Sequence, residues 1–193
     1  DAVRSATKRL QSNQTSAEDT ITSFSSFDSD GFTLSEASQN NNGETFASWN
    51  WLAANGTASN SNGSITSTVS ANTTAGFSIV SYTGTASAGA TVGHGLGVKP
   101  DMIITKARAI ADNWGVYHKS LGATKGLYLN TTNAEITSSA YYNNTEPTST
   151  LVTLGDNEAT NDNDTMIMYA FAEKQGYSKF GSYIGNGSTD GTF

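Results

Sequence analysis

The sequence predicts an all-β protein built from antiparallel β-sandwich or jelly-roll-like units that repeat along the chain. Ser, Thr, Asn and Gly dominate the composition, with only 14% charged residues and two Pro. Such residues favour strands, turns and loops over long helices. Eight Phe, eight Tyr and three Trp supply core material, many of them inside short strand-like runs. These runs recur at about 8–12-residue spacing with turn residues between them, which is typical of sandwiches.

In the first 54 residues the sequence predicts short strands and at most one short helix. Residues 1–20 fit either a short helix around "AVRSATKRL" or an extended chain. The run "ITSFSSFDSDGFTLSE" (21–36) predicts two short strands around "DSDG", where Gly31 can supply positive φ. The run "ETFASWNWLA" (44–53) predicts a strand, because Thr45, Ala47, Trp49 and Trp51 fall on one face by alternation. We expect its tryptophans to be core positions.

The rest of the chain predicts a series of strands. The stretch 55–75 is either a flexible connection or an edge strand, because "GSITSTVSA" alternates inside a low-complexity sequence. The runs that follow are "GFSIVSYTG" (76–84), "DMIITK" (101–106), "NWGVYHK" (113–119), "KGLYLN" (125–130), "STLVTLG" (149–155), "TMIMYAFAE" (165–173) and "GYSKFGSYIG" (176–185). No helix of convincing length separates them, so a parallel α/β sheet is not expected.

The chain repeats part of itself. Residues 5–20, "SATKRLQSNQTSAEDT", and 122–137, "GATKGLYLNTTNAEIT", agree without gaps at nine positions. The runs 44–53 and 164–173 also align, placing Trp49 against Tyr169 and Trp51 against Phe171. The runs "GFSIVSYTG" and "GYSKFGSYIG" align in turn.

These alignments divide the chain out of phase with its own repeat. Residues 1–54 are the back half of a first β unit, and 55–75 are the connection or edge strand. Residues 76–175 form a complete unit, and 176–193 carry the first strand of a further unit. A half unit would leave open sheet edges. We therefore expect residues 176–185 to pair either with the N-terminal half or with a neighbouring chain.

Charge and hydropathy exclude several function classes. The net charge of −7 argues against a nucleic-acid partner, which requires a basic patch. No apolar run approaches the roughly 18 residues of a membrane span, so membrane insertion is not expected. The sequence has no Cys, which leaves neither a disulfide framework nor a thiolate site.

No catalytic constellation emerges from the polar motifs. His94 lies in "HGLG", without a nucleophile elbow or a partner at metal-ligand spacing, and a turn is the favoured reading. "DSDG" (28–31) and "DNEATNDND" (156–164) each lack parts of a calcium loop and indicate turns. We therefore expect no catalytic, metal or cofactor-binding residue, no cofactor and no enzyme activity. A glycan-degrading enzyme remains an alternative only through the 17 acidic residues, which no pattern assigns.

A surface is the remaining candidate site. The run "SSAYYNNTEPTS" (138–149) places Tyr141 and Tyr142 beside Asn143 and Asn144. Exposed Tyr and Asn hold sugars by stacking and by amide hydrogen bonds, so these four residues are candidates for glycan or surface contact. The alternative is a hairpin loop whose tyrosines cover a sheet edge.

Several phrases resemble a known family. "ATKRLQSNQTSAEDT", "FDSDGFTL", "GFSIVSYTG", "VGHGLGVKPDMIITK", "NWGVYHK" and "GYSKFGSYIGNGSTDG" resemble the repeated β-rich modules of structural proteins of marine tailed phages, such as tail-fibre proteins. The resemblance implies location in the virion, outside the cell, and structural or receptor-contacting work. It supplies no site residues.

The resemblance and the repeat together predict a non-enzymatic phage virion structural protein, a tail fibre or similar appendage. Its expected partners are other copies of itself, forming a homo-oligomer, or other virion proteins, with host-surface glycan as a further partner. One alternative is a carbohydrate-binding module that recognises a receptor. The other is a capsid-surface decoration protein or an extracellular filament subunit.

Overall fold

The computed structural model describes residues 1–189 and 191. Residues 190, 192 and 193 of the predicted further unit (176–193) lie outside the described residues. The predicted class is confirmed: the chain is nearly all β, and within the described residues its strands pair with one another antiparallel; a single parallel bridge joins Ile65 to Val92. The described residues contain no helix long and apolar enough to cross a membrane.

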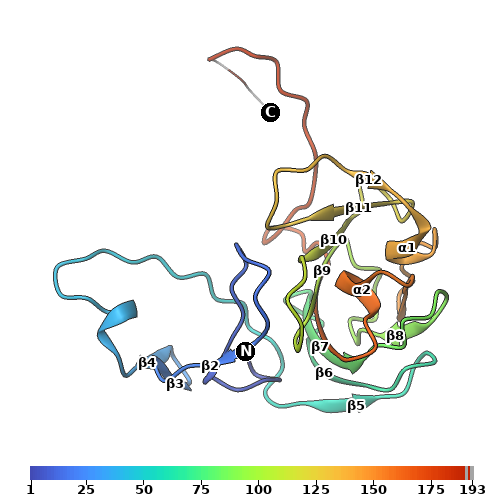
Figure 1. Ribbon diagram of the computed structural model, residues 1–193. Helices are drawn as coiled ribbons and strands as arrows, with labels where there is room; N and C mark the ends of the chain where they lie inside the picture. Colours follow the sequence, from blue (N-terminus) through green and yellow to red (C-terminus); the bar gives the residue numbers. More distant parts are fainter. Residues whose placement is uncertain (190, 192–193) are drawn as a thin grey trace.

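The centre of the molecule is an eight-stranded sheet in the order β12-β11-β10-β9-β14-β7-β6-β5 (Figure 1). Its strands, in chain order, are β5 (Ala58–Asn60), β6 (Ser67–Asn72), β7 (Phe77–Thr83), β9 (Met102–Ala107), β10 (Gly115–His118), β11 (Lys125–Tyr128), β12 (Ile136–Thr137) and β14 (Thr165–Phe171). The strongest sequence patterns, those of β7 and β14, lie at its middle and pair along their full length. Both strands are rich in Ile, Val, Met and aromatic residues because both of their faces are covered.

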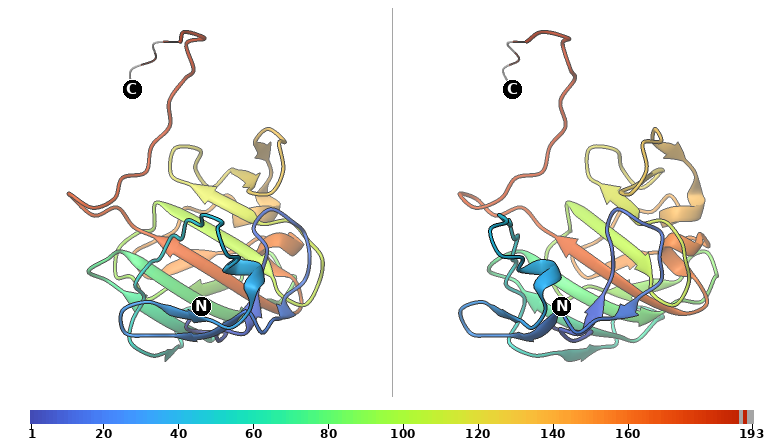
Figure 2. Two further views of the ribbon diagram at one scale, coloured as in Figure 1. Left: turned by 90° about the vertical axis from the view of Figure 1, so that its left-hand side faces the viewer. Right: turned by 60° about the vertical axis from the view of Figure 1, so that its left-hand side comes forward.

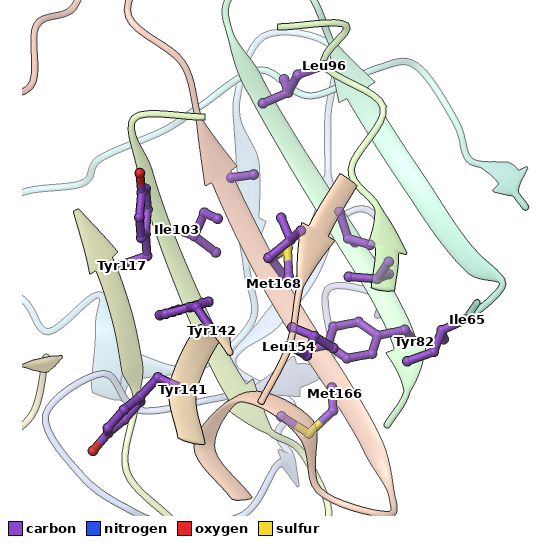
Figure 3. Close-up of a cluster of buried hydrophobic side chains, with 14 of the residues drawn as sticks. Ile65, Tyr82, Leu96, Ile103, Tyr117, Tyr141, Tyr142, Leu154, Met166 and Met168 are labelled. Atoms are coloured by element: carbon purple, nitrogen blue, oxygen red, sulfur yellow. The ribbon is translucent and has the colours of Figure 1, made fainter. Parts of the chain in front are cut away.

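One face of this sheet, here called the inner face, carries the main core. A second layer lies over it, made of β8 (Thr91–Gly93), β13 (Leu151–Thr153), α1 (Ser139–Tyr142) and α2 (Glu158–Asn161). Met166 and Met168 point from the sheet into this core, where Tyr82, Tyr142 and Leu154 also lie (Figure 3). Val80 of β7 belongs to the same cluster. The result is a sandwich with one broad sheet and one small, irregular layer.

The opposite, outer face is covered in its middle by the N-terminal residues. Phe77, Ile79 and Ile167 form a second core cluster there, and Val3 and Leu10 pack against it. The N-terminal region itself holds two hairpins, β1 (Lys8–Arg9) with β2 (Asp19–Thr20), and β3 (Phe24–Phe27) with β4 (Phe32–Leu34), followed by the 3-10 turn η1 (Ala37–Gln39). For residues 1–20, the extended alternative is therefore the observed one, and β3 and β4 confirm the predicted hairpin.

The turn between β3 and β4 closes differently from the prediction. Gly31 does not adopt positive φ. Instead the Asp28 carboxylate accepts hydrogen bonds from the hydroxyls of Ser26 and Thr33, both at 2.8 Å, and the Asp28 N–H donates to the Gly31 carbonyl oxygen. Side-chain acceptors thus make a left-handed residue unnecessary in this turn.

The low-complexity stretch 55–75 forms a β-hairpin of the sheet. β5 is the edge strand, and β6 lies between β5 and β7. Ser67 and Ser70 are buried there and donate hydrogen bonds to the carbonyl oxygens of Gly93 and Ala54. Small hydroxyl side chains can be buried on a sheet when a backbone acceptor lies within reach, so low complexity here does not mean an unstructured connection.

Two predicted strands are wrong within the single chain. Neither 44–53 nor 176–185 forms a strand. Residues 44–53 run as irregular chain, and the first residues of 176–185 form a turn in which the Ser178 N–H donates to the Lys174 carbonyl oxygen at 2.9 Å. The β14 strand already has β7 on one side and β9 on the other, so the strand-like pattern of 44–53 finds no central position to fill. The segment 176–185 also makes no strand with the N-terminal half, which was one of its two expected partners. Its first part stays against the sheet, where Phe180 contacts Phe171, and the chain beyond it leads away from the sandwich (Figures 1 and 2).

The internal repeat is visible in the structure. β1 pairs with β2 as Lys8↔Thr20, and β11 pairs with β12 as Lys125↔Thr137; these are the positions that the sequence alignment equates. The two hairpins therefore share one register.

Candidate interaction surface

The structure places the four predicted surface residues differently from one another. Tyr141 is 3% exposed and Tyr142 fully buried, so the expectation of exposed tyrosines is wrong. Asn143 is half-buried and Asn144 exposed. The loop alternative is also incomplete, because the tyrosines belong to the short helix α1 and lie in the main core (Figure 3).

Local capping explains why this run turns into the core. Ser138 is the N-cap of α1, and its side chain accepts a hydrogen bond from the Ala140 N–H. Asn143 ends the helix in the left-handed conformation, with φ 49° and ψ 35°. This single turn directs both tyrosine rings inward. Ser138 and Asn143 were the sequence signal for the helix.

The rings then pack edge to face. Tyr142 meets Tyr117 at 5.6 Å between ring centroids, and Tyr141 meets Tyr128 at 5.8 Å. Gly126 of β11 lies directly under the Tyr141 ring, since a Cβ there would be 2.7 Å from the ring's Cγ. The two tyrosines are therefore core residues in this chain, and only the asparagines remain at the surface.

The polar motifs that suggested chemistry have structural partners. His94 is buried; its Nδ1 accepts from the Leu96 N–H, which makes Nε2 the atom that donates to the Thr148 carbonyl oxygen at 3.3 Å. Burial lowers the pKa of His94, so the ring is neutral. In "DNEATNDND", Asn157 caps α2. Among the described residues, no three His, Asp or Glu side chains are grouped so that they could hold a metal ion.

An ion-pair network that sequence reasoning missed fixes the N-terminal region to the outer face. Arg108 donates to both Glu18 carboxylate oxygens, at 2.9 and 3.0 Å, and Arg4 donates to Glu18 at 2.9 Å. Arg4 also donates to the Tyr169 hydroxyl of β14. Burial alone would raise the pKa of Glu18, but the hydrogen bonds from Arg108 and Arg4 outweigh it, and this pKa is lowered.

Backbone contacts complete the attachment. The Glu18 N–H donates to the Arg108 carbonyl oxygen at 2.7 Å, and the Trp114 indole N–H donates to the carbonyl oxygens of Gln11 and Gln14. Backbone hydrogen bonds and the ion pairs of Glu18 thus hold the β1–β2 hairpin against the outer face. The sequence signal was indirect: Glu18 lies in the repeated phrase.

A different kind of surface lies on the two segments that carry unused strand patterns. We call residues 44–53 arm N and residues 176–185 arm C. Most of the large exposed apolar side chains of the described chain belong to these arms: Phe46, Trp49, Trp51, Leu52, Tyr177, Tyr183 and Ile184. Trp49 is 76% exposed and Ile184 is 95% exposed. Apolar side chains gathered on segments in this way mark an interaction site.

Both arms contact the same aromatic side chain, Phe171. Arm N is also held where Ala53 is buried in the second core cluster and where the Leu52 carbonyl oxygen accepts a hydrogen bond from the Asn72 side chain. Trp51 of arm N lies edge-on to Phe171 at 5.9 Å and also contacts Phe77 at 6.3 Å. Phe180 of arm C lies 6.2 Å from Phe171. Both arms therefore contact the same end of the β7–β14 pair. Gly181 and Ser182 of arm C also line a shallow apolar groove of about 410 Å³ with Met102, Leu127 and Leu129 on the outer face.

Comparison with known proteins gives one family. The family described as a domain of unknown function (DUF7483) matches the chain over residues 1–193. No curated protein matches the chain, and no solved structure does.

Proposed function

The chain belongs to the DUF7483 family, and for it we propose a non-enzymatic structural role in a phage virion, as part of a tail fibre or similar appendage. The observation that carries the proposal is the pair of arms. Both have strand sequences, both display large apolar side chains to solvent, and neither forms a strand in the described chain. A protein whose work is assembly needs such exposed apolar segments at its surface.

The polar residues support the same role. Glu146, whose side chain is half exposed, accepts hydrogen bonds from the Tyr117 hydroxyl at 2.6 Å, from Lys99 at 2.7 Å and from the Ala123 N–H at 2.7 Å. Glu18 is bound by two arginines. Both carboxylates bind groups on other elements and so stabilise the fold, as expected of a structural module.

The experiment tests location and assembly together. The 193-residue chain is studied by sedimentation over a wide concentration range, and antibodies against it are used to label particles of the phage that encodes it. We expect concentration-dependent oligomers and labelling of an appendage. A chain that stays monomeric at high concentration, together with particles that carry no label, would contradict the proposal.

Contact with a host-surface glycan is the second candidate, and the observation favouring it is the position of Asn143 and Asn144 at the surface in left-handed conformation. Their amides are available for hydrogen bonds beside a rigid helix. Screening of the chain on a glycan array tests this function. Binding that Asn143→Gly with Asn144→Gly abolishes would support it, because glycine keeps the backbone conformation; an array without hits removes this candidate.

A further inference from the structure

We propose that arm C of one copy pairs with arm N of a second copy as an antiparallel two-stranded ladder, in the register of the β7–β14 pair. This inference rests on the proposed assembly role and specifies its interface. It is argued from the internal repeat, which equates each arm with a strand whose pairing is known in this structure.

The first step is that the repeat equates backbone conformations as well as letters. Ser5 has φ 94°, and its equivalent Gly122 has φ 76°. The Ile21 N–H donates to the Thr7 carbonyl oxygen, and the equivalent Ser138 N–H donates to Thr124. Residues 1–21 are therefore a structural copy of the β11–β12 hairpin and its flanks.

The second step continues the alignment to arm N. "FTLSEASQNNNGET" (32–45) lies against "VTLGDNEATNDNDT" (152–165) without gaps. The strand β4 stands where β13 stands, and the helical turn η1 stands where α2 stands. Arm N follows η1 as β14 follows α2. It is thus the counterpart of the strand that, in the complete unit, has partners on both sides.

The third step identifies arm C with β7. "GYS" at 176–178 matches "GFS" at 76–78, and the two glycines share the left-handed conformation, with φ 77° at Gly176 and 70° at Gly76. β7 is the antiparallel partner of β14. Arm C, the counterpart of β7, therefore has the sequence of a partner strand for arm N, the counterpart of β14. Among the described residues no strand pairs with arm N.

The register follows from these equivalences. Phe77 pairs with Phe171, Ser78 with Ala170 and Ile79 with Tyr169. The corresponding pairs between the arms are Tyr177 with Trp51, Ser178 with Asn50, and Lys179 with Trp49. Two of these are interactions that stabilise cross-strand neighbours, an aromatic pair and a cation over an indole ring.

Within one chain both arms contact Phe171 at positions that differ from the ladder register. Trp51 and Phe180 both contact Phe171, at 5.9 and 6.2 Å, so position 180 lies on the ring that position 51 also contacts, whereas the ladder places position 177 opposite position 51. An offset of three residues would turn the side chains of one arm to the opposite face. In a second copy, Phe180 contacts that copy's own Phe171, so its arm C is not tied to Phe171 of the first chain and can meet arm N in the ladder register.

The two arms are different surfaces, so their pairing is a head-to-tail contact. Such a contact leaves arm N free at one end of a dimer and arm C free at the other, and it continues into a filament or closes into a ring. The partner is therefore a second copy of this module, joined by strand addition.

Disulfide trapping tests the register, because the chain has no Cys of its own. Asn50→Cys and Ser178→Cys are made in separate chains, mixed and oxidised. We expect disulfide-linked heterodimers on non-reducing gels. Ser48→Cys mixed with Ser178→Cys is the matched control; it is shifted by two residues, which places the Cα atoms beyond disulfide reach, and no linkage is expected.

The doubly substituted chain separates pairing between copies from pairing within one. Linked dimers and larger species support the proposal. A monomer with an internal disulfide at low protein concentration overturns it, and so does equal linkage in the shifted control. If the unsubstituted chain assembles but the mixture does not cross-link, the arm pairing is wrong while the structural role stands. If the unsubstituted chain does not assemble and particles carry no label, both fail.

Discussion

At the scale of single residues, the repeat places two different residue types, Ser and Gly, at equivalent positions with the same backbone conformation. Ser5 and Gly122 both precede a hairpin with positive φ. A non-glycine residue in this region is strained. The chain therefore uses glycine at one copy of this position and tolerates strain at the other.

Exchange of these two residues should change stability in opposite directions. We expect Ser5→Gly to raise the free energy of unfolding by about 0.5–1 kcal/mol, and Gly122→Ser to lower it by about 1 kcal/mol. Urea unfolding followed by circular dichroism measures both. A stabilising Gly122→Ser substitution would contradict the structural equivalence of the two positions.

The Glu18 network predicts a pH dependence. The folded pKa of Glu18 is lowered, so the unfolded chain binds this proton more readily. Its contribution to stability is therefore complete above the unfolded pKa of about 4.3 and is lost as pH falls through the folded pKa. We expect Glu18→Gln to lower the free energy of unfolding by about 2 kcal/mol at pH 7.

The comparison is made at two pH values against a matched variant. The difference between wild type and Glu18→Gln should shrink when unfolding is measured near pH 3. Glu135→Gln is the control, because the Lys125–Glu135 pair on β11 and β12 is more exposed and such pairs contribute little. Equal losses for the two substitutions at pH 7 would contradict the structural role given to Glu18.

At the scale of elements, the β11–β12 hairpin differs from the equivalent β1–β2 hairpin in the element that packs on it. Helix α1 covers β11, and Gly126 fits under the Tyr141 ring. The equivalent residue of β1 is Arg9, whose side chain is directed to Asp19. Glycine at 126 is thus required by the helix that packs there rather than by the hairpin.

Gly126→Ala should therefore be costly. The added methyl would lie within 2.8 Å of three ring carbons of Tyr141, and overpacking of this kind costs about 1–3 kcal/mol. Thermal unfolding measures the loss, and Gly185→Ala is the neutral control, because a Cβ there meets nothing within 4 Å. A loss that is no larger than the control's would place α1 elsewhere.

The elements also show which parts of the fold could be predicted from the sequence. β7 and β14 were predictable because strands covered on both faces are continuously apolar over several residues. Arm N has an equally good pattern, but a strand also needs a neighbour, and alternation in one segment does not supply one. The inward turn of Tyr141 and Tyr142 was missed because the Asn-rich flank is typical of a loop; only the caps Ser138 and Asn143 reveal the helix.

At the scale of the whole molecule, the chain divides its tryptophans between two environments. Trp114 is buried, at 5% exposure, under the N-terminal region, whereas Trp49 and Trp51 are 76% and 52% exposed on arm N. Folding of the single chain fixes the first environment. Pairing of the arms between copies would change only the second.

Tryptophan fluorescence should therefore report assembly separately from folding. As concentration rises, we expect the emission maximum to move to shorter wavelength, because ladder formation removes the Trp49 and Trp51 rings from water. Trp49→Phe should reduce this shift, whereas Trp114→Phe should leave it unchanged. Sedimentation on the same samples fixes the range in which oligomers form. An emission maximum that stays constant across that range would mean that the copies associate through another surface, because arm N could not then be buried in the contact.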